Sequence, residues 1–99
     1  MRQDLAPLAI VVKLPSALVR LFPGAVRCFE LPGSDSVQTV ADVIDTLEGR
    51  WPGMRDRICD STPRIRRHMN VFVAGERVTL ETRLAPGAEV VVLTAISGG

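Results

Sequence analysis

Hydrophobic and polar residues follow a strand-like pattern in the first third of the chain. Residues 8–14 are rich in β-branched side chains and predict a strand that Pro15 ends. Residues 25–31 predict a second strand, which the turn at Pro23-Gly24 would pair antiparallel with the first. The facing of this second strand stays open, because apolar side chains compete for the buried side from both of its faces: Val26 and Cys28 against Phe29 and Leu31.

Beyond residue 39 the apolar spacing changes from two residues to that of a helix. Thr39 is the expected N-cap, and Asp42 stands three residues later, where a capping box places its acid. Pro52-Gly53 would end the helix. The apolar stripe that needs a sheet to lie on consists of Val40, Val43, Ile44, Leu47 and Trp51.

The last third of the chain returns to strand periodicity after an irregular or short helical crossing at residues 54–63. Strands are expected over residues 69–74, 76–80 and 89–96. The order strand, strand, helix, strand, short strand, strand predicts an α+β chain with the β-grasp arrangement. This is a mixed sheet of four to five strands with one main helix packed across it. We expect a single β-grasp domain over residues 1–96 and a flexible tail over residues 97–99.

Strand alternation predicts that one face of this sheet packs on the helix and that the other stays open. The side chains expected to face the helix are Val71, Val73, Val90 and Val92. Those expected on the open face, close to where the tail departs, are Phe72, Val91 and Leu93. An apolar patch open to water usually marks a binding site. We therefore expect these open-face residues, together with Ile96 and Ser97, to bind partner proteins.

Composition and charge indicate an ordinary globular domain that needs no metal or disulfide to fold. The chain has 99 residues, 46% of them hydrophobic, and a net charge of +1. Arg64, Arg66 and Arg67 crowd together, yet no aromatic residues interleave with them. A solvated loop that helps a partner to dock is therefore favoured over a nucleic-acid site.

Residue types that carry out catalysis or bind metal are scarce. His68 is the only histidine, and Cys28 and Cys59 lie too far apart for a metal-ligand spacing. We expect no catalytic residue, no metal and no bound cofactor. The apolar run before Lys13 is too short for a membrane span and has no signal-peptide features. The expected protein is a cytoplasmic monomer with reduced thiols, and neither nucleic acid nor membrane is an expected partner.

The last two residues of the sequence, Gly98 and Gly99, are the strongest functional signal. Glycine has no Cβ, so a diglycine can pass through a channel that is too narrow for side chains. The carboxylate of Gly99 could then enter the active site of another protein. The competing interpretation is a frayed end without function.

Three stretches resemble the MoaD/ThiS family of ubiquitin-like sulfur carriers: residues 39–44, 67–76 and 93–99. The resemblance implies that an activating enzyme related to the ubiquitin E1 uses ATP to adenylate Gly99. Sulfur then displaces AMP and leaves a thiocarboxylate, which is delivered to a sulfur-acceptor enzyme. Gly98 would give passage through the partner's channel.

The branch of this family is indicated by the tail. Molybdopterin-synthase small subunits commonly have Pro-Pro where this chain has Thr94-Ala95. The chain looks more like carriers that serve cysteine synthesis or sulfur insertion into natural products. The alternatives are a molybdopterin-synthase small subunit, a ubiquitin-like modifier conjugated through Gly99, and an interaction domain whose diglycine is inert.

Overall fold

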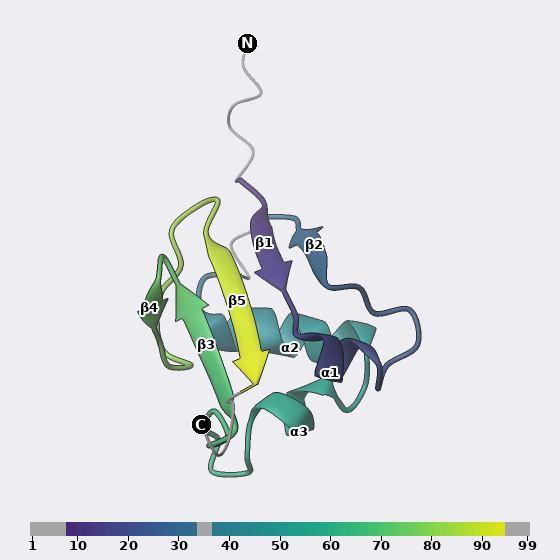
Figure 1. Cartoon of the computed structure of the whole chain (residues 1–99). Helices are drawn as coiled ribbons and strands as arrows, with labels where there is room; N and C mark the ends of the chain where they lie inside the picture. The colour runs from purple at the N-terminus through teal and green to yellow at the C-terminus, as the bar shows by residue number, and fades with distance from the viewer. Residues whose placement is uncertain (1–7, 34–36, 95–99) are drawn as a thin grey trace.

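A computed structural model describes residues 8–33 and 37–94 of the chain (Figure 1). Five strands form one sheet in the order β2-β1-β5-β3-β4. β1 and β5 run parallel, and the other neighbouring pairs are antiparallel, so the sheet is mixed as predicted. The strands are β1 (Ile10–Lys13), β2 (Cys28–Leu31), β3 (Met69–Val73), β4 (Glu76–Arg77) and β5 (Glu89–Thr94).

Within the described residues, three helices accompany the sheet: α1 (Ser16–Val19), α2 (Val40–Arg50) and α3 (Met54–Ile58). Figure 1 shows α2 lying across the back of the sheet. The predicted capping box is confirmed: the Asp42 N–H donates to Thr39 Oγ1 at 3.2 Å, and the Thr39 N–H donates to Asp42 Oδ2 at 3.0 Å. Two otherwise unpaired donors of the first helical turn are therefore satisfied locally.

The core lies between α2 and the back of the sheet. Val40, Val43, Ile44 and Leu47 are all buried, as the helical stripe predicted. From the sheet, Val71, Val90 and Val92 are buried against them, so the predicted strand register is confirmed. Val73, near the sheet edge, and Trp51, at the end of the helix, are half-buried against the same core.

The second predicted strand begins later than expected, and its facing is settled by packing. β2 starts at Cys28, where the chain comes alongside β1. Leu31 is buried and Phe29 is half-buried, whereas Cys28 and Val26 are exposed. The ring of Phe29 meets Trp51 edge-on at 5.4 Å between centroids. This aromatic contact with the end of α2 turns the odd-numbered side of the strand inward.

The short strand predicted over residues 76–80 is shorter still. β4 covers only Glu76–Arg77, after a tight turn in which Ala74 and Gly75 have φ values of 54° and 80°. Beyond it the chain bonds to the start of α2. The N–H groups of Val40 and Ala41 donate to the carbonyls of Thr82 and Leu80 at 3.0 and 2.9 Å. Residues 80–82 therefore extend the capping of α2 instead of the sheet.

The end of the chain lies partly outside the described residues. The strand predicted over residues 89–96 is confirmed as β5 up to Thr94. The predicted domain boundary between residues 96 and 97 lies beyond that point and stays a prediction.

Candidate partner-binding site

One row of side chains crosses the open face of the sheet. Lys13 pairs with Cys28 on one side and with Val91 on the other, Val91 pairs with Phe72, and Phe72 pairs with Arg77. Directly paired residues of neighbouring strands project to the same side of a sheet. Since Val90 and Val92 face the core, this row projects to the front in Figure 1, opposite α2.

The predicted partner-binding residues of β3 and β5 form the apolar part of this face. Phe72 and Val91 are half-buried, and Leu93 is 44% exposed. Together with Val73 and Ala88 they line a shallow depression of about 520 Å³. We call Phe72, Val91 and Leu93 the open-face patch. The structure brings these three predicted residues together.

Charged residues flank the open-face patch. The Lys13 Nζ and Glu89 Oε2 atoms form an ion pair of 2.9 Å that joins β1 to β5. The hydrogen bond to Glu89, with the charge of that carboxylate, raises the pKa of Lys13. Both side chains are about half exposed, so the pair contributes little to stability. Its effect is to hold one positive and one negative group at the rim of the patch.

β5 carries the open-face patch to the end of the described chain. It is the middle strand of the sheet, and its last residue, Thr94, pairs with Met69 at the start of β3. The other predicted site residues, Ile96, Ser97, Gly98 and Gly99, lie outside the described residues. Leu93 therefore stands three positions before Ile96, the first of these predicted site residues.

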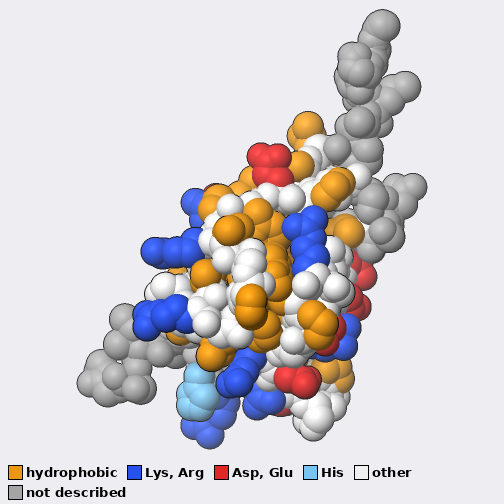
Figure 2. Space-filling view, turned by 90° about the vertical axis from the view of Figure 1, so that its right-hand side faces the viewer, with side chains coloured by type: hydrophobic (Ala, Val, Ile, Leu, Met, Phe, Trp, Pro, Cys, Tyr) orange, Lys and Arg blue, Asp and Glu red, His pale blue; other side chains and the backbone are white. Residues whose placement is uncertain are grey.

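A second apolar area lies on the edge of the molecule that Figure 2 shows, where orange side chains gather among blue basic ones. The loop between α1 and β2 contributes Leu21 and Val26, which are 50% and 49% exposed. The sequence pattern placed Val26 in the second predicted strand, as a candidate for its buried side, and did not single out Leu21; β2 in fact begins only at Cys28. The sequence signal that could have indicated this apolar area is the presence of hydrophobic residues inside a turn-rich segment.

The described residues offer little other chemistry. No cluster of three or more His, Cys, Asp or Glu residues in ranges 8–33 and 37–94 could hold a metal ion. Cys28 and Cys59 are free thiols, and burial raises the pKa of Cys59. His68 is exposed. In the same ranges, the helices are too short or too polar to cross a bilayer.

The chain is similar in sequence to known proteins. The sulfur carrier protein CysO of Mycobacterium tuberculosis is 36% identical over 72 residues, which cover 67% of this chain and 77% of that protein. Small archaeal modifier protein 1 of Haloferax volcanii is 32% identical over 65 residues, 66% of this chain and 75% of that protein.

The fold comparison agrees with the sequence comparison. The crystal structure of the Amycolatopsis orientalis BexX/CysO complex contains a chain that superimposes with a TM-score of 0.76 at 29% identity. The match covers 92% of this chain and 100% of that one, and the predicted β-grasp fold is confirmed. The sequence model of the ThiS family matches residues 21–99. Since that match covers well over half of the chain and includes the open-face patch and both terminal glycines, the protein belongs to the ThiS family.

Proposed function

We propose that this protein is a sulfur carrier whose Gly99 carboxyl group is converted to a thiocarboxylate. The observation that carries the proposal is the ThiS family match, which runs through β5 and includes Gly98 and Gly99. The similarity to CysO, which is named a sulfur carrier protein, supports it. The fold supports it as well, because the middle strand of the sheet ends at Thr94, immediately before residues 95–99 in the sequence.

The chemistry needs activation, because a carboxylate is a poor acyl donor. An oxygen of the Gly99 carboxylate attacks the α-phosphorus of ATP, and pyrophosphate leaves with the electrons of the broken P–O bond. A hydrosulfide ion or an equivalent sulfur nucleophile then attacks the carbonyl carbon. AMP leaves with the electrons of the C–O bond, one proton is released, and the C–S bond of the thiocarboxylate remains. No electron is gained or lost overall.

The carrier itself supplies binding and delivery in this scheme, and partner enzymes supply the catalysis. ATP is bound by an E1-like activating enzyme, and a second enzyme accepts the sulfur. We assign the open-face patch, with Ile96 and Ser97, to docking with these enzymes, because an aromatic and two aliphatic side chains lie together there, two of them on the strand that precedes the tail. In Amycolatopsis orientalis, CysO is found in complex with BexX, which supports the formation of such a pair. The proposed acceptor serves cysteine or sulfur-metabolite synthesis in the cytoplasm.

Intact-protein mass spectrometry tests this proposal. The protein is incubated with its activating enzyme, ATP and sulfide, and the expected product is heavier by the difference between a sulfur and an oxygen atom. Deletion of Gly99, or Gly98→Leu, should abolish the product without lowering the melting temperature, since a chain end contributes little packing. The matched control is Gly49→Leu, at an exposed position in α2 with open space around its Cβ position.

The outcome is decisive in both directions. A thiocarboxylate that forms on the parent chain and on Gly49→Leu, but on neither tail variant, supports the carrier. Normal sulfur delivery by the chain that lacks Gly99 would overturn it, as would an unchanged mass for the parent chain.

A protein modifier is the second candidate, because the Haloferax volcanii relative is named a modifier protein. It would use the same activated Gly99 to acylate lysine side chains of other proteins. Immunoblots of cell extracts separate the two functions: a modifier gives ladders of conjugates that disappear when Gly99 is deleted. A carrier gives the free chain alone.

A further inference from the structure

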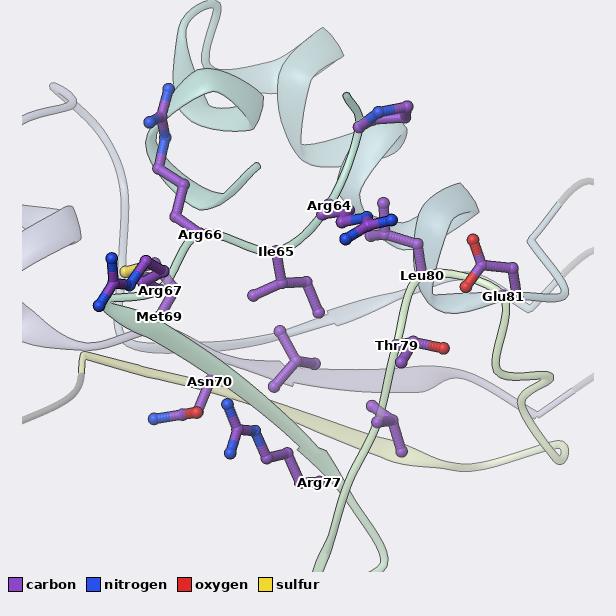
Figure 3. A pocket seen from close by; sticks show the side chains of 13 residues that line it. Arg64, Ile65, Arg66, Arg67, Met69, Asn70, Arg77, Thr79, Leu80 and Glu81 are labelled. Carbon is purple, nitrogen blue, oxygen red and sulfur yellow. The ribbon is translucent and has the colours of Figure 1, made fainter. Parts of the chain in front are cut away.

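A second hollow lies beside the sheet, at the edge formed by β3 and β4 (Figure 3). It has a volume of about 620 Å³ and lies between residues 63–67 and 77–81. Its floor is aliphatic, and its rim carries four arginines: Arg64, Arg66, Arg67 and Arg77. We call it the arginine groove. It shares no lining residue with the open-face patch, which it adjoins where Arg77 pairs with Phe72.

The charge of this groove is unbalanced. Its lining contains four exposed arginines and one acidic residue, Glu81, although the whole chain has a net charge of only +1. Among the described residues, none of these arginines forms an ion pair, in contrast to Arg55, whose Nη2 lies 2.8 Å from Asp45 Oδ1. Arg66 is held against α3 and acts on the Asp60 carboxylate, whereas the positive charges that reach the hollow repel one another, so an anionic partner would gain from them.

The rim is held in shape by the surrounding chain. Arg66 Nε donates to the Asp56 carbonyl oxygen at 2.6 Å, and the Arg66 backbone N–H donates to the Ile58 carbonyl at 2.8 Å. The Val78 N–H donates to the Val71 carbonyl at 2.9 Å and fixes the opposite wall. The groove is therefore formed before any partner arrives, which lowers the entropy cost of binding.

The shape of the groove selects the kind of anion. Figure 3 shows Arg64 and Arg77 on opposite sides of the hollow, so its charges are spread out and do not converge on one point. A single phosphate group needs convergent donors. Stacked nucleic-acid bases need aromatic side chains, and none of the described residues that line the groove is aromatic. The aliphatic floor, which includes Ile65 and Leu80, favours a ligand with apolar side chains between its charges.

We infer that the arginine groove binds an extended acidic segment of a partner protein, with aliphatic side chains on the floor and carboxylates at the rim. Met69 at one end of the groove pairs with Thr94, so the bound segment lies beside the point where β5 ends. A partner that holds this segment is therefore held beside Thr94, the last residue of β5. The inference goes beyond the proposed function and does not depend on sulfur chemistry.

Fluorescence anisotropy tests the inference with a fluorescein-labelled peptide of sequence Glu-Glu-Leu-Glu-Leu-Glu-Glu. The peptide should bind the full chain, and its affinity should fall as sodium chloride rises from roughly 50 to roughly 300 mM, because exposed charges are screened. The double variant Arg64→Glu, Arg67→Glu should bind about tenfold or more weakly, since two favourable contacts become repulsive. The matched control is Arg20→Glu, Arg27→Glu, which changes the net charge equally at exposed positions outside the groove.

Two further probes separate the contributions of charge and floor. A peptide with serine in place of both leucines should bind more weakly than the parent peptide, because it leaves the aliphatic floor unfilled. An oligothymidylate probe tests the nucleic-acid alternative. Equal weakening by the two double variants, no binding of the acidic peptide, or tighter binding of the oligothymidylate would each overturn the inference. Melting curves confirm that both double variants are folded.

Discussion

Substitutions at two adjacent residues of β5 should have separate effects, one on the stability of the fold and the other on partner binding. Val92 is 1% exposed and faces the core, whereas Leu93 is 44% exposed and belongs to the open-face patch. Val92→Ala removes two buried methyl groups, a loss of about 1.6 kcal/mol at about 0.8 kcal/mol for each group. The cavity that remains raises the cost to about 2–3 kcal/mol. For a domain of this size, that lowers the melting temperature by roughly 8–24 °C.

Leu93→Asp should have the opposite profile. The side chain is already partly in water, so its replacement leaves no closed cavity, and the stability cost is at most about 1 kcal/mol. If the patch docks the activating enzyme, however, the new charge weakens that complex by about 1–3 kcal/mol, which is about 5- to 150-fold in Kd. Val92→Ala should leave the affinity unchanged at temperatures where it is folded.

Urea and thermal unfolding followed by circular dichroism give the stability, and isothermal titration with the activating enzyme gives the affinity. Equal stability losses for the two variants would refute the assigned facing of β5. An unchanged affinity for Leu93→Asp would remove the open-face patch from the docking surface, even if the facing is right.

The remaining predictions concern the start of α2 and the two thiols. Thr39→Ala should destabilise the fold by about 1 kcal/mol in urea unfolding, because the Asp42 N–H loses its acceptor, and an unchanged midpoint would show that the cap is dispensable. The pKa of Asp42 is lowered from 3.8, mainly by the hydrogen bond that its carboxylate accepts from the Gln38 N–H. The contribution of the ionised carboxylate to stability is therefore complete above that pH and is lost as pH falls below it. Asp42→Asn should weaken this acid dependence of the urea midpoint, and an identical pH profile would contradict it. In native protein, a thiol reagent should modify the exposed Cys28 quickly and the buried Cys59 only upon unfolding; equal rates in the native state would show that α3 opens readily.

The helix and the central strands could be predicted from the sequence because their signals are local. The stripe from Val40 to Leu47 follows one helical period, and Thr39 and Asp42 satisfy the first turn without help from distant residues. Likewise, successive side chains of a strand point to opposite faces, so assigning Val71 and Val92 to the core places Phe72, Val91 and Leu93 on the other face. The irregular elements lack such signals. The four-residue helix α1 begins directly after Pro15 and is too short to show a helical period, although the Val19 and Arg20 N–H groups bond to the Pro15 and Ser16 carbonyls.

Short-range patterns and a few motif residues were enough to predict the family, the β-grasp order of elements and the strand residues that face α2. Tertiary structure alone decided the facing of β2, since Phe29 turns inward to meet Trp51, which is 22 positions away in the chain. It likewise decided that β4 stops at Arg77, because the carbonyls of Leu80 and Thr82 bond to α2. The arginine groove also depends on tertiary structure. Arg64 and Arg77 come from separate segments, and both line one hollow only because these segments pack at the same edge of the sheet. Periodicity reports which side of an element is apolar, and contacts between distant segments decide what that side meets.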